Sequence, residues 1–340
     1  MARKGADMEK KRLLIVGNTV SDDWEFRRGV EAATGEPWDV RVCVINRYDG
    51  LHRFTRFLTY FIGPLKIFLQ RGRYEKIVSW EQFLGLILVF YLRLFHIKNA
   101  PEITVMALIY KPKKGLIGRL FEWFVRYTVT SDYIRQIVVF SRSEVNYYSK
   151  LFGIPKEKLR AEVVGIADRP DIPRGEPAAT EKYYISPGRS NRDYAFLRRA
   201  WPESAAPVHI VCDVEKSEDS GNVIYKKSCH GDEYLRLLAG AYACIVPLES
   251  RKFSSGQLVF LQSAMLGVPV ISTQNDTVPE YVEDGVTGLM IDKTPEALRQ
   301  ALNALDDPQT RERMSRSARA RFEQYFSLFE LGKRVGHYVK

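Results

Sequence analysis

Cysteine is scarce in this sequence. The four residues, Cys43, Cys212, Cys229 and Cys244, form no C-x-x-C pair in a chain of 340 residues. This scarcity and spacing exclude a disulfide framework and a zinc site built on paired cysteines. Cys43 and Cys244 stand in apolar segments, where free thiols are often buried. We therefore expect a protein of a reducing compartment.

Long apolar runs are also missing. The longest covers residues 83–92 and ends at Arg93, whereas a membrane-spanning helix needs about 20 apolar residues. Residues 1–12 are strongly charged, and the apolar stretch after them, 13–16, is too short for the core of a signal peptide. We expect no transmembrane helix, no signal peptide and a cytoplasmic location.

The positive charge is confined to one half of the chain. The net charge is +10, yet residues 1–170 hold 29 Lys and Arg against 18 Asp and Glu, and residues 171–340 hold 22 against 23. An excess in one half predicts an anionic partner for that half, either a membrane surface or a nucleic acid. No nucleic-acid-binding motif occurs, so we expect a membrane and no nucleic acid.

Metal-binding patterns are likewise absent. The five histidines show no ligand spacing, and there is no Asp-x-Asp triplet of the kind found in metal-dependent transferases with a single domain. We expect neither a metal nor a cofactor.

Apolar segments alternate with helical patterns along the chain. Hydrophobic residues make up 45 % of it, enough for two domains with separate cores. Strands are predicted at 12–18, 40–46, 76–80, 103–109 and 136–140, and again at 183–186, 208–212, 243–247 and 269–272. Helical patterns between strands, such as 234–241 and 258–266, are typical of doubly wound parallel sheets. We predict an α/β protein with two Rossmann-like domains.

Prolines and glycines interrupt this alternation at 156–181, which contains Pro170, Pro173 and Pro177. We place the linker at 168–180. The predicted organisation is an N-terminal domain at 1–170, a second domain at 171–325 and a C-terminal helix at 326–340 that could cross back to the first domain. Tandem sheets of this kind bind ligands at the carboxyl ends of their strands.

The most specific pattern lies at 254–292, SSGQLVFLQSAMLGVPVISTQNDTVPEYVEDGVTGLMID. Its A-M-L-G-V-P-V and P-E-Y-V-E-D-G-V-T-G steps resemble the donor-binding segment of retaining glycosyltransferases of family 4. Two earlier stretches, 139–144 (VFSRSE) and 186–194 (SPGRSNRDY), resemble the end of that family's first domain and the start of its second. The resemblance covers residues 136–340 and is weak before them.

This resemblance implies a GT-B fold, in which two Rossmann-like domains face a cleft. It also implies transfer of a sugar from a nucleotide-diphosphate sugar with retention of configuration. We expect a UDP-sugar as donor, with a GDP-sugar as second choice. The expected acceptor is lipid-linked or another glycan, at the inner face of the cell membrane. The first domain would bind this acceptor and the second domain the donor.

Two carboxylates of the family pattern are missing. Ser254 and Gln262 stand where the family has glutamates, and the turn reads S-S-G-Q in place of E-G-F-G. In the family, the second Glu holds the donor ribose and the first contacts the sugar. The Gln262 amide can still bond a ribose hydroxyl, whereas Ser254 supplies no charge. A catalytically inactive scaffold is therefore one alternative. A nucleotide-sugar epimerase is another, although we find no carboxylate and histidine constellation for it.

The turn before the helix at 258–266 is a candidate anion site. Backbone N–H groups of Ser255, Gly256, Gln257 and Leu258 would meet the diphosphate of the donor at the helix N-terminus. The alternative is an ordinary serine cap on a core helix.

Arg189 and Arg192 directly follow the strand at 183–186. In the family an Arg and a Lys near this turn bind the diphosphate, and guanidinium groups suit phosphate oxygens. We assign both arginines to catalysis, with two solvated surface arginines as the alternative. Asp193 would either orient one of them or cap the following helix.

The first domain offers fewer candidates. Gly17 and Asn18 end its first strand and would face the donor, although the sequence around them is not G-x-G-x-x-G. Glu81 directly follows the strand at 76–80 and could contact the acceptor. A surface or helix-capping glutamate is the alternative for Glu81.

Basic residues flank two aromatic-rich segments of the first half, 53–73 and 111–126. Those we assign to membrane binding are Arg53, Arg56, Lys66, Arg71, Arg73, Lys113 and Lys114. Basic groups beside exposed aromatic and aliphatic side chains suit an anionic lipid surface. Core helices with basic ends are the alternative.

Overall fold

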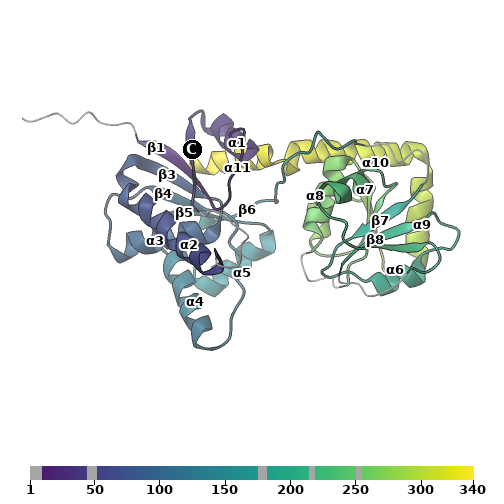
Figure 1. Cartoon of the computed structure of the whole chain (residues 1–340), viewed down its shortest axis with the longest axis horizontal. Helices are drawn as coiled ribbons and strands as arrows, with labels where there is room; N and C mark the ends of the chain where they lie inside the picture. The colour runs from purple at the N-terminus through teal and green to yellow at the C-terminus, as the bar shows by residue number, and fades with distance from the viewer. Residues whose placement is uncertain (1–9, 44–51, 175–181, 214–218, 250–254) are drawn as a thin grey trace, which may run out of the picture. The chain divides into compact units, whose positions relative to one another are not determined.

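The computed structural model describes residues 10–43, 52–174, 182–213, 219–249 and 255–340, with the side chains of 52–57 excepted. The chain divides into two compact units (Figure 1), one formed by Met1–Val163 with Leu331–Lys340 and the other by Val164–Glu330. The N-terminal segment of the first unit ends at Val163, which precedes the linker predicted at 168–180. The residues from Leu331 onward also belong to the first unit.

The first unit is built on a parallel six-stranded sheet in the order β2-β1-β3-β4-β5-β6. Its strand centres are apolar because helices cover both faces of a sheet of this type. The strands are β1 (Lys11–Val16), β2 (Trp38–Val42), β3 (Tyr74–Ser79), β4 (Glu102–Val105), β5 (Ile134–Val139) and β6 (Leu159–Ala161). The last of these was not predicted and lies within the segment 156–181.

The helices of the first unit connect these strands. They are α1 (Glu25–Thr34), α2 (His52–Leu69), α3 (Gln82–Leu94), α4 (Gly115–Val129) and α5 (Arg142–Phe152), with short 3-10 turns at Arg71–Arg73 and Lys156–Lys158. Helix α3 packs against both α2 and α4 (Figure 1). It is apolar on nearly all sides, and most of its residues between Leu84 and Leu92 are buried. Of the helices that the structure describes, none is long and apolar enough to cross a membrane.

The second unit repeats the pattern with the strand order β12-β11-β10-β7-β8-β9, again all parallel. Its strands are β7 (Tyr184–Pro187), β8 (Val208–Val211), β9 (Val223–Lys226), β10 (Cys244–Val246), β11 (Val270–Thr273) and β12 (Gly288–Ile291). Its helices are α6 (Tyr194–Ala200), α7 (Gly231–Ala239), α8 (Gln257–Leu266), α9 (Pro295–Asp306) and α10 (Pro308–Arg321), with a 3-10 turn at Val278–Glu280 and a π-helix at Phe322–Phe326. The prediction of two doubly wound parallel sheets is confirmed.

The last helix, α11 (Leu328–Val339), lies mostly in the first unit. Leu331 and Val335 bury their side chains there. The carboxylate of Glu162, itself only 8 % exposed, accepts a hydrogen bond from Arg334 Nε at 2.6 Å. It also bonds the hydroxyl of Tyr338. Apolar packing and a half-buried ion pair therefore hold the helix in place.

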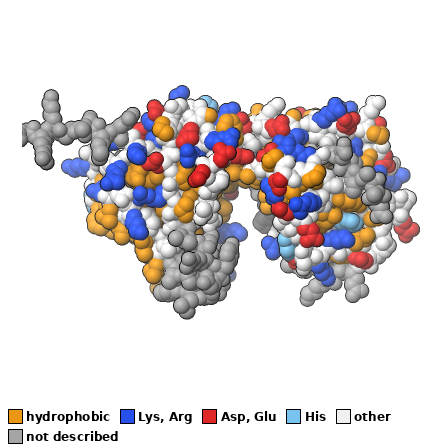
Figure 2. Space-filling view, turned by 45° about the horizontal axis from the view of Figure 1, so that its top comes forward, with side chains coloured by type: hydrophobic (Ala, Val, Ile, Leu, Met, Phe, Trp, Pro, Cys, Tyr) orange, Lys and Arg blue, Asp and Glu red, His pale blue; other side chains and the backbone are white. Residues whose placement is uncertain are grey.

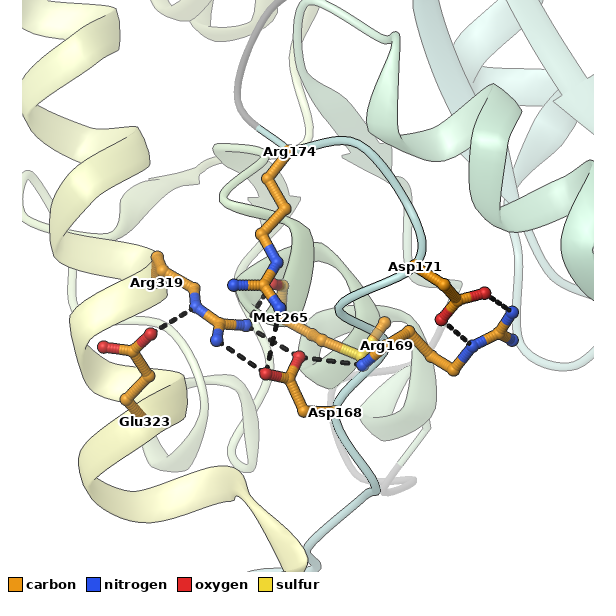
Figure 3. A network of polar contacts seen from close by, with 7 residues as sticks. All are labelled: Asp168, Arg169, Asp171, Arg174, Met265, Arg319 and Glu323. Atoms are coloured by element: carbon orange, nitrogen blue, oxygen red, sulfur yellow. Dashed lines mark hydrogen bonds and ion pairs between the residues drawn. The ribbon is translucent and has the colours of Figure 1, made fainter.

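The segment that begins the second unit is tied to helix α10 (Figure 3). The Ile166 N–H donates to the Phe326 carbonyl, and the Leu328 N–H donates to the Ile166 carbonyl, both at 2.9 Å. Asp168 accepts two hydrogen bonds from the Arg319 guanidinium, at 2.9 and 2.7 Å. The two chain segments that lead to the first unit are thus paired inside the second.

Candidate functional site

The turn after β7 is organised around Arg192. Its Nε donates to the carbonyl of Pro187 and its Nη1 to that of Ser190, both at 3.0 Å. Gly188 has φ +126°, and a Cβ there would stand 2.7 Å from the Arg192 guanidinium. Any larger residue would displace the arginine, so this turn requires glycine.

Arg192 carries a positive charge that no carboxylate balances among the residues that the structure describes. Its side chain is half-buried, and because water solvates a buried charge poorly, burial lowers the pKa of the guanidinium from the ordinary value. Within the described ranges, no Asp or Glu forms an ion pair with it. A poorly solvated cation without a counter-ion favours binding of an anion.

The turn before α8 lies against the same arginine. Gly256 adopts φ +87° and occupies the N-cap position, and a Cβ on it would meet Arg192 Nη2 at 3.5 Å. Ser255 does not cap the helix. Its hydroxyl accepts a hydrogen bond from Asn191 Nδ2 at 3.0 Å, which joins the two turns. The first N–H groups of α8 have no partner inside the helix, so they add to the anion-binding character of this point.

A pocket of about 310 Å³ opens beside these turns at the carboxyl ends of β7 and β8. It is lined by the exposed Arg189, by Leu258, Val259 and Gln262 of α8, and by Pro187, Gly188, Val211, Cys212, Asp213, Cys229, His230 and Tyr234. Of its lining residues, Arg189, Leu258 and Gln262 were predicted from the sequence. Asp213, Tyr234 and the pairing of His230 Nε2 with Asp213 Oδ2 at 3.1 Å were not.

Asp193 caps the helix that follows it, which is one of the two roles predicted for it; the other was to orient an arginine. Its Oδ1 accepts a hydrogen bond from the Phe196 N–H at 2.8 Å, and it is the N-cap of α6. Its other oxygen binds Lys293 Nζ at 3.1 Å. Burial raises the pKa of Asp193, but these hydrogen bonds and the Lys293 charge lower it below the usual value. Lys293 was not among the predicted site residues.

In the first unit, Gly17 and Glu81 come together at the carboxyl ends of β1 and β3. The Gly17 N–H donates to Glu81 Oε2 at 2.6 Å, and the exposed Asn18 follows. Burial raises the pKa of Glu81, although the bond from Gly17 opposes the rise. Glu81 is the N-cap residue of α3 but makes no capping bond with its side chain. It is therefore a half-buried carboxyl group rather than a surface charge.

The remaining candidates are Ser254 and the basic residues assigned to membrane binding. Ser254 and the side chains of Arg53 and Arg56 lie outside the described residues. Lys66, Arg73, Lys113 and Lys114 are exposed, whereas Arg71 is half-buried and donates to the Phe68 carbonyl at 3.0 Å. Across the described segments, no three His, Cys, Asp or Glu side chains form a group that could hold a metal ion.

Gln262 gives a first testable prediction. If it bonds the ribose, Gln262→Ala should raise the KM for the donor about two- to tenfold, the equivalent of one neutral hydrogen bond of about 0.5–1.5 kcal/mol. Gln262→Glu should be tolerated. Steady-state kinetics across donor concentrations measure both. Unfolded protein from both variants would make the residue structural and contradict the assignment.

Similarity to known proteins is found in the second unit, which contains the turns around Arg192 and Gly256. Residues 186–307 match the family model described as Glycosyl transferases group 1. The D-rhamnosyltransferase WbpZ of Pseudomonas aeruginosa is 35 % identical over 109 residues, which cover 31 % of this chain and 28 % of that protein. The match to the Glycosyl transferases group 1 model lies within the second unit. The aligned part amounts to little more than a quarter of the relative's length.

Several solved structures resemble this protein over nearly its whole chain. The sucrose-phosphate synthase of Thermosynechococcus elongatus has a TM-score of 0.60 at 15 % identity, covering 97 % of this chain and 98 % of its own. HepE of Anabaena, solved in complex with UDP, has a TM-score of 0.61 at 12 % identity, covering 96 % and 98 %. A glycosyltransferase from Rickettsia africae has a TM-score of 0.61 at 13 % identity, covering 97 % and 98 %. The fold is GT-B.

Proposed function

We propose that this protein is a glycosyltransferase of family 4. It moves a sugar from a nucleotide-diphosphate donor, a UDP-sugar first and a GDP-sugar second, to a lipid-linked or glycan acceptor with retention of configuration. The observation that carries the proposal is the half-buried Arg192 guanidinium, which has no carboxylate counter-ion in the described part of the chain. HepE, a structural neighbour solved with UDP, supports the choice of base, and the relative named a rhamnosyltransferase supports the reaction class.

The chemistry follows from the charge that develops on the leaving group. As the bond between sugar and phosphate breaks, negative charge grows on the diphosphate oxygens, and donors already aimed there stabilise the transition state. Arg192, the turn at Ser255 and Gly256 and the N-terminus of α8 supply such donors. Arg189 would reach the same phosphates from the solvent side, and Gln262 would hold the ribose. Glu81 would accept a hydrogen bond from the acceptor. No metal is required.

A thermal-shift panel tests donor binding. A nucleoside diphosphate at 100-fold excess over its Kd should stabilise the fold by about 2.7 kcal/mol. We expect UDP or GDP to raise Tm, and ADP and TDP to do so less. If none of these compounds shifts Tm, the inactive scaffold becomes the better account.

We also propose that the first unit attaches to the cytoplasmic face of an anionic membrane. Helix α2 leaves a row of large apolar side chains exposed, and α4 leaves another. They are Leu58, Phe61, Ile62, Leu65 and Leu69 on α2, and Leu116, Ile117, Leu120 and Trp123 on α4. Figure 2 shows hydrophobic side chains interspersed with Lys and Arg on the first unit. Core helices would not leave so many apolar groups in water, so this arrangement favours the lipid interface.

Vesicle flotation tests this attachment. Each Lys or Arg near an anionic surface contributes about 1 kcal/mol, screened by salt. Binding should therefore require anionic lipid, weaken in high salt and fall when Arg53, Arg56, Arg71 and Arg73 are changed to Gln. Equal recovery with neutral and anionic vesicles, or none with either, would contradict the proposal.

A further inference from the structure

A second pocket lies in the first unit, where β2 ends beside α2. It has a volume of about 420 Å³, with Arg41, Val42 and Cys43 on the strand side and Ile62, Gly63 and Lys66 on the helix side. Gly63 makes this arrangement possible, because a Cβ there would stand 2.6 Å from the Cys43 Cβ and 3.0 Å from its carbonyl oxygen. The helix therefore rests directly on the end of the strand, and the pocket opens beside that contact.

The polar part of this pocket is positively charged. Burial raises the pKa of the Cys43 thiol to about 12; the charge of Arg41 opposes the rise, that of Glu81 adds to it, and that of Lys66 opposes it. Both cations therefore lie close to a thiol that stays neutral. Arg41 Nη1 donates to Gln70 Oε1 at 2.8 Å. Over the ranges that the structure describes, neither cation forms an ion pair with a carboxylate. An anion would supply the missing negative charge.

The pocket also has apolar lining that is exposed to solvent. Ile62 lines the pocket and is 46 % exposed. Leu58, Phe61, Leu65 and Leu69 are exposed on the same helix at intervals of three or four residues, so they form one stripe with Ile62. A ligand seated here would have an anionic group between Arg41 and Lys66 and an apolar chain along α2.

We propose that this pocket binds the phosphate group of a long-chain lipid phosphate, with the lipid chain lying along the apolar stripe of α2. The inference rests on the proposed lipid-linked acceptor, and it names the subsite and the chemical class that this acceptor must have. Arg41 and Lys66 bind the phosphate oxygens. Val42 and Ile62 contact the first carbons of the chain.

Flotation with two kinds of phosphatidylcholine vesicle tests this subsite. One kind contains a polyprenyl phosphate and the other contains phosphatidylglycerol at matched surface charge. The wild-type protein should prefer the polyprenyl phosphate about tenfold, as expected for two charge-assisted contacts. Arg41→Gln with Lys66→Gln should abolish the preference, whereas Arg41→Lys with Lys66→Arg should keep it and show that the pocket still folds.

The control is Arg299→Gln with Arg316→Gln, which removes the same charge from exposed positions of the second unit. It should leave the preference unchanged. Equal binding of the wild-type protein to both vesicles, or a preference that survives in the Gln variant, would overturn the subsite. Stabilisation by UDP or GDP would be unaffected in both cases, so failure of the subsite is distinguishable from failure of the transferase.

Discussion

Replacing Arg192 by Gln should lower turnover by one to three decades, because a preorganised charge aimed at the leaving diphosphate is lost. The stability of the free protein should change little. Removing a poorly solvated charge is favourable, while the loss of the bonds to the carbonyls of Pro187 and Ser190 is unfavourable. The increase in Tm caused by a nucleoside diphosphate should disappear.

These three readouts separate a phosphate ligand from a structural arginine. If Arg192 only shaped the turn, the variant would lose Tm and would still be stabilised by UDP or GDP. Arg299→Gln is the matched control, since Arg299 is exposed and pairs with Glu296 on its own helix. It should leave turnover and Tm unchanged.

Replacing Arg319 by Ala should destabilise the second unit by about 2 kcal/mol, which lies between the values for exposed and buried ion pairs. The side chains of Arg319 and Asp168 are only 17 % and 23 % exposed. Without Arg319, the Asp168 carboxylate keeps Arg174 at 3.0 Å, and the carbonyl of Met265 loses a hydrogen bond of 2.7 Å. Thermal or urea unfolding measures the change.

The same ion pair predicts a dependence on pH. Burial raises the pKa of Asp168, but the bonds and charge of Arg319 lower it below the ordinary value of 3.8. A lowered pKa in the folded state contributes stability above the unfolded pKa, and that stability is lost as pH falls through the folded value. The difference in unfolding free energy between the wild type and Arg319→Ala should therefore be largest at neutral pH and should become smaller below about pH 4.

Arg316→Ala is the control on the same helix. Arg316 is 78 % exposed and pairs with Glu312, so its loss should cost less than about 0.5 kcal/mol. Two results would contradict the role given to the Asp168–Arg319 pair. One is a loss of stability in Arg316→Ala as large as that in Arg319→Ala. The other is a stability difference between the wild type and Arg319→Ala that increases as the pH falls.

Most of the fold could be predicted because buried parallel strands are short continuous apolar runs. The strand at 13–16 and those near Ile77, Ile103 and Ile137 are of this kind. Of the strands outside the predicted ranges, β12 lies at the edge of its sheet, and so do β6 and β9. Edge strands bury less of their surface, and Arg160 and Lys226 give β6 and β9 a polar character typical of a loop. Their pairing depends on the neighbouring strand rather than on their own pattern.

The candidate site was predictable only as a set of positions. The turns around Arg192 and Gly256 follow from their places after a strand and before a helix. The contact between these turns depends on tertiary packing, as does the poor solvation of the Arg192 charge. The pocket's Asp213 and Tyr234 belong to no sequence motif. The pairing of Gly17 with Glu81 likewise joins residues 64 positions apart.

The most direct test of the central claim is a transfer assay with UDP- and GDP-sugars and membrane lipid extract as the source of acceptor. The account predicts equal amounts of released nucleoside diphosphate and glycosylated lipid. NMR of the product should show the donor's anomeric configuration, and Arg192→Gln should remove most of both products. Absence of nucleoside diphosphate and of glycosylated product with every sugar tested, from protein that is folded, would contradict it.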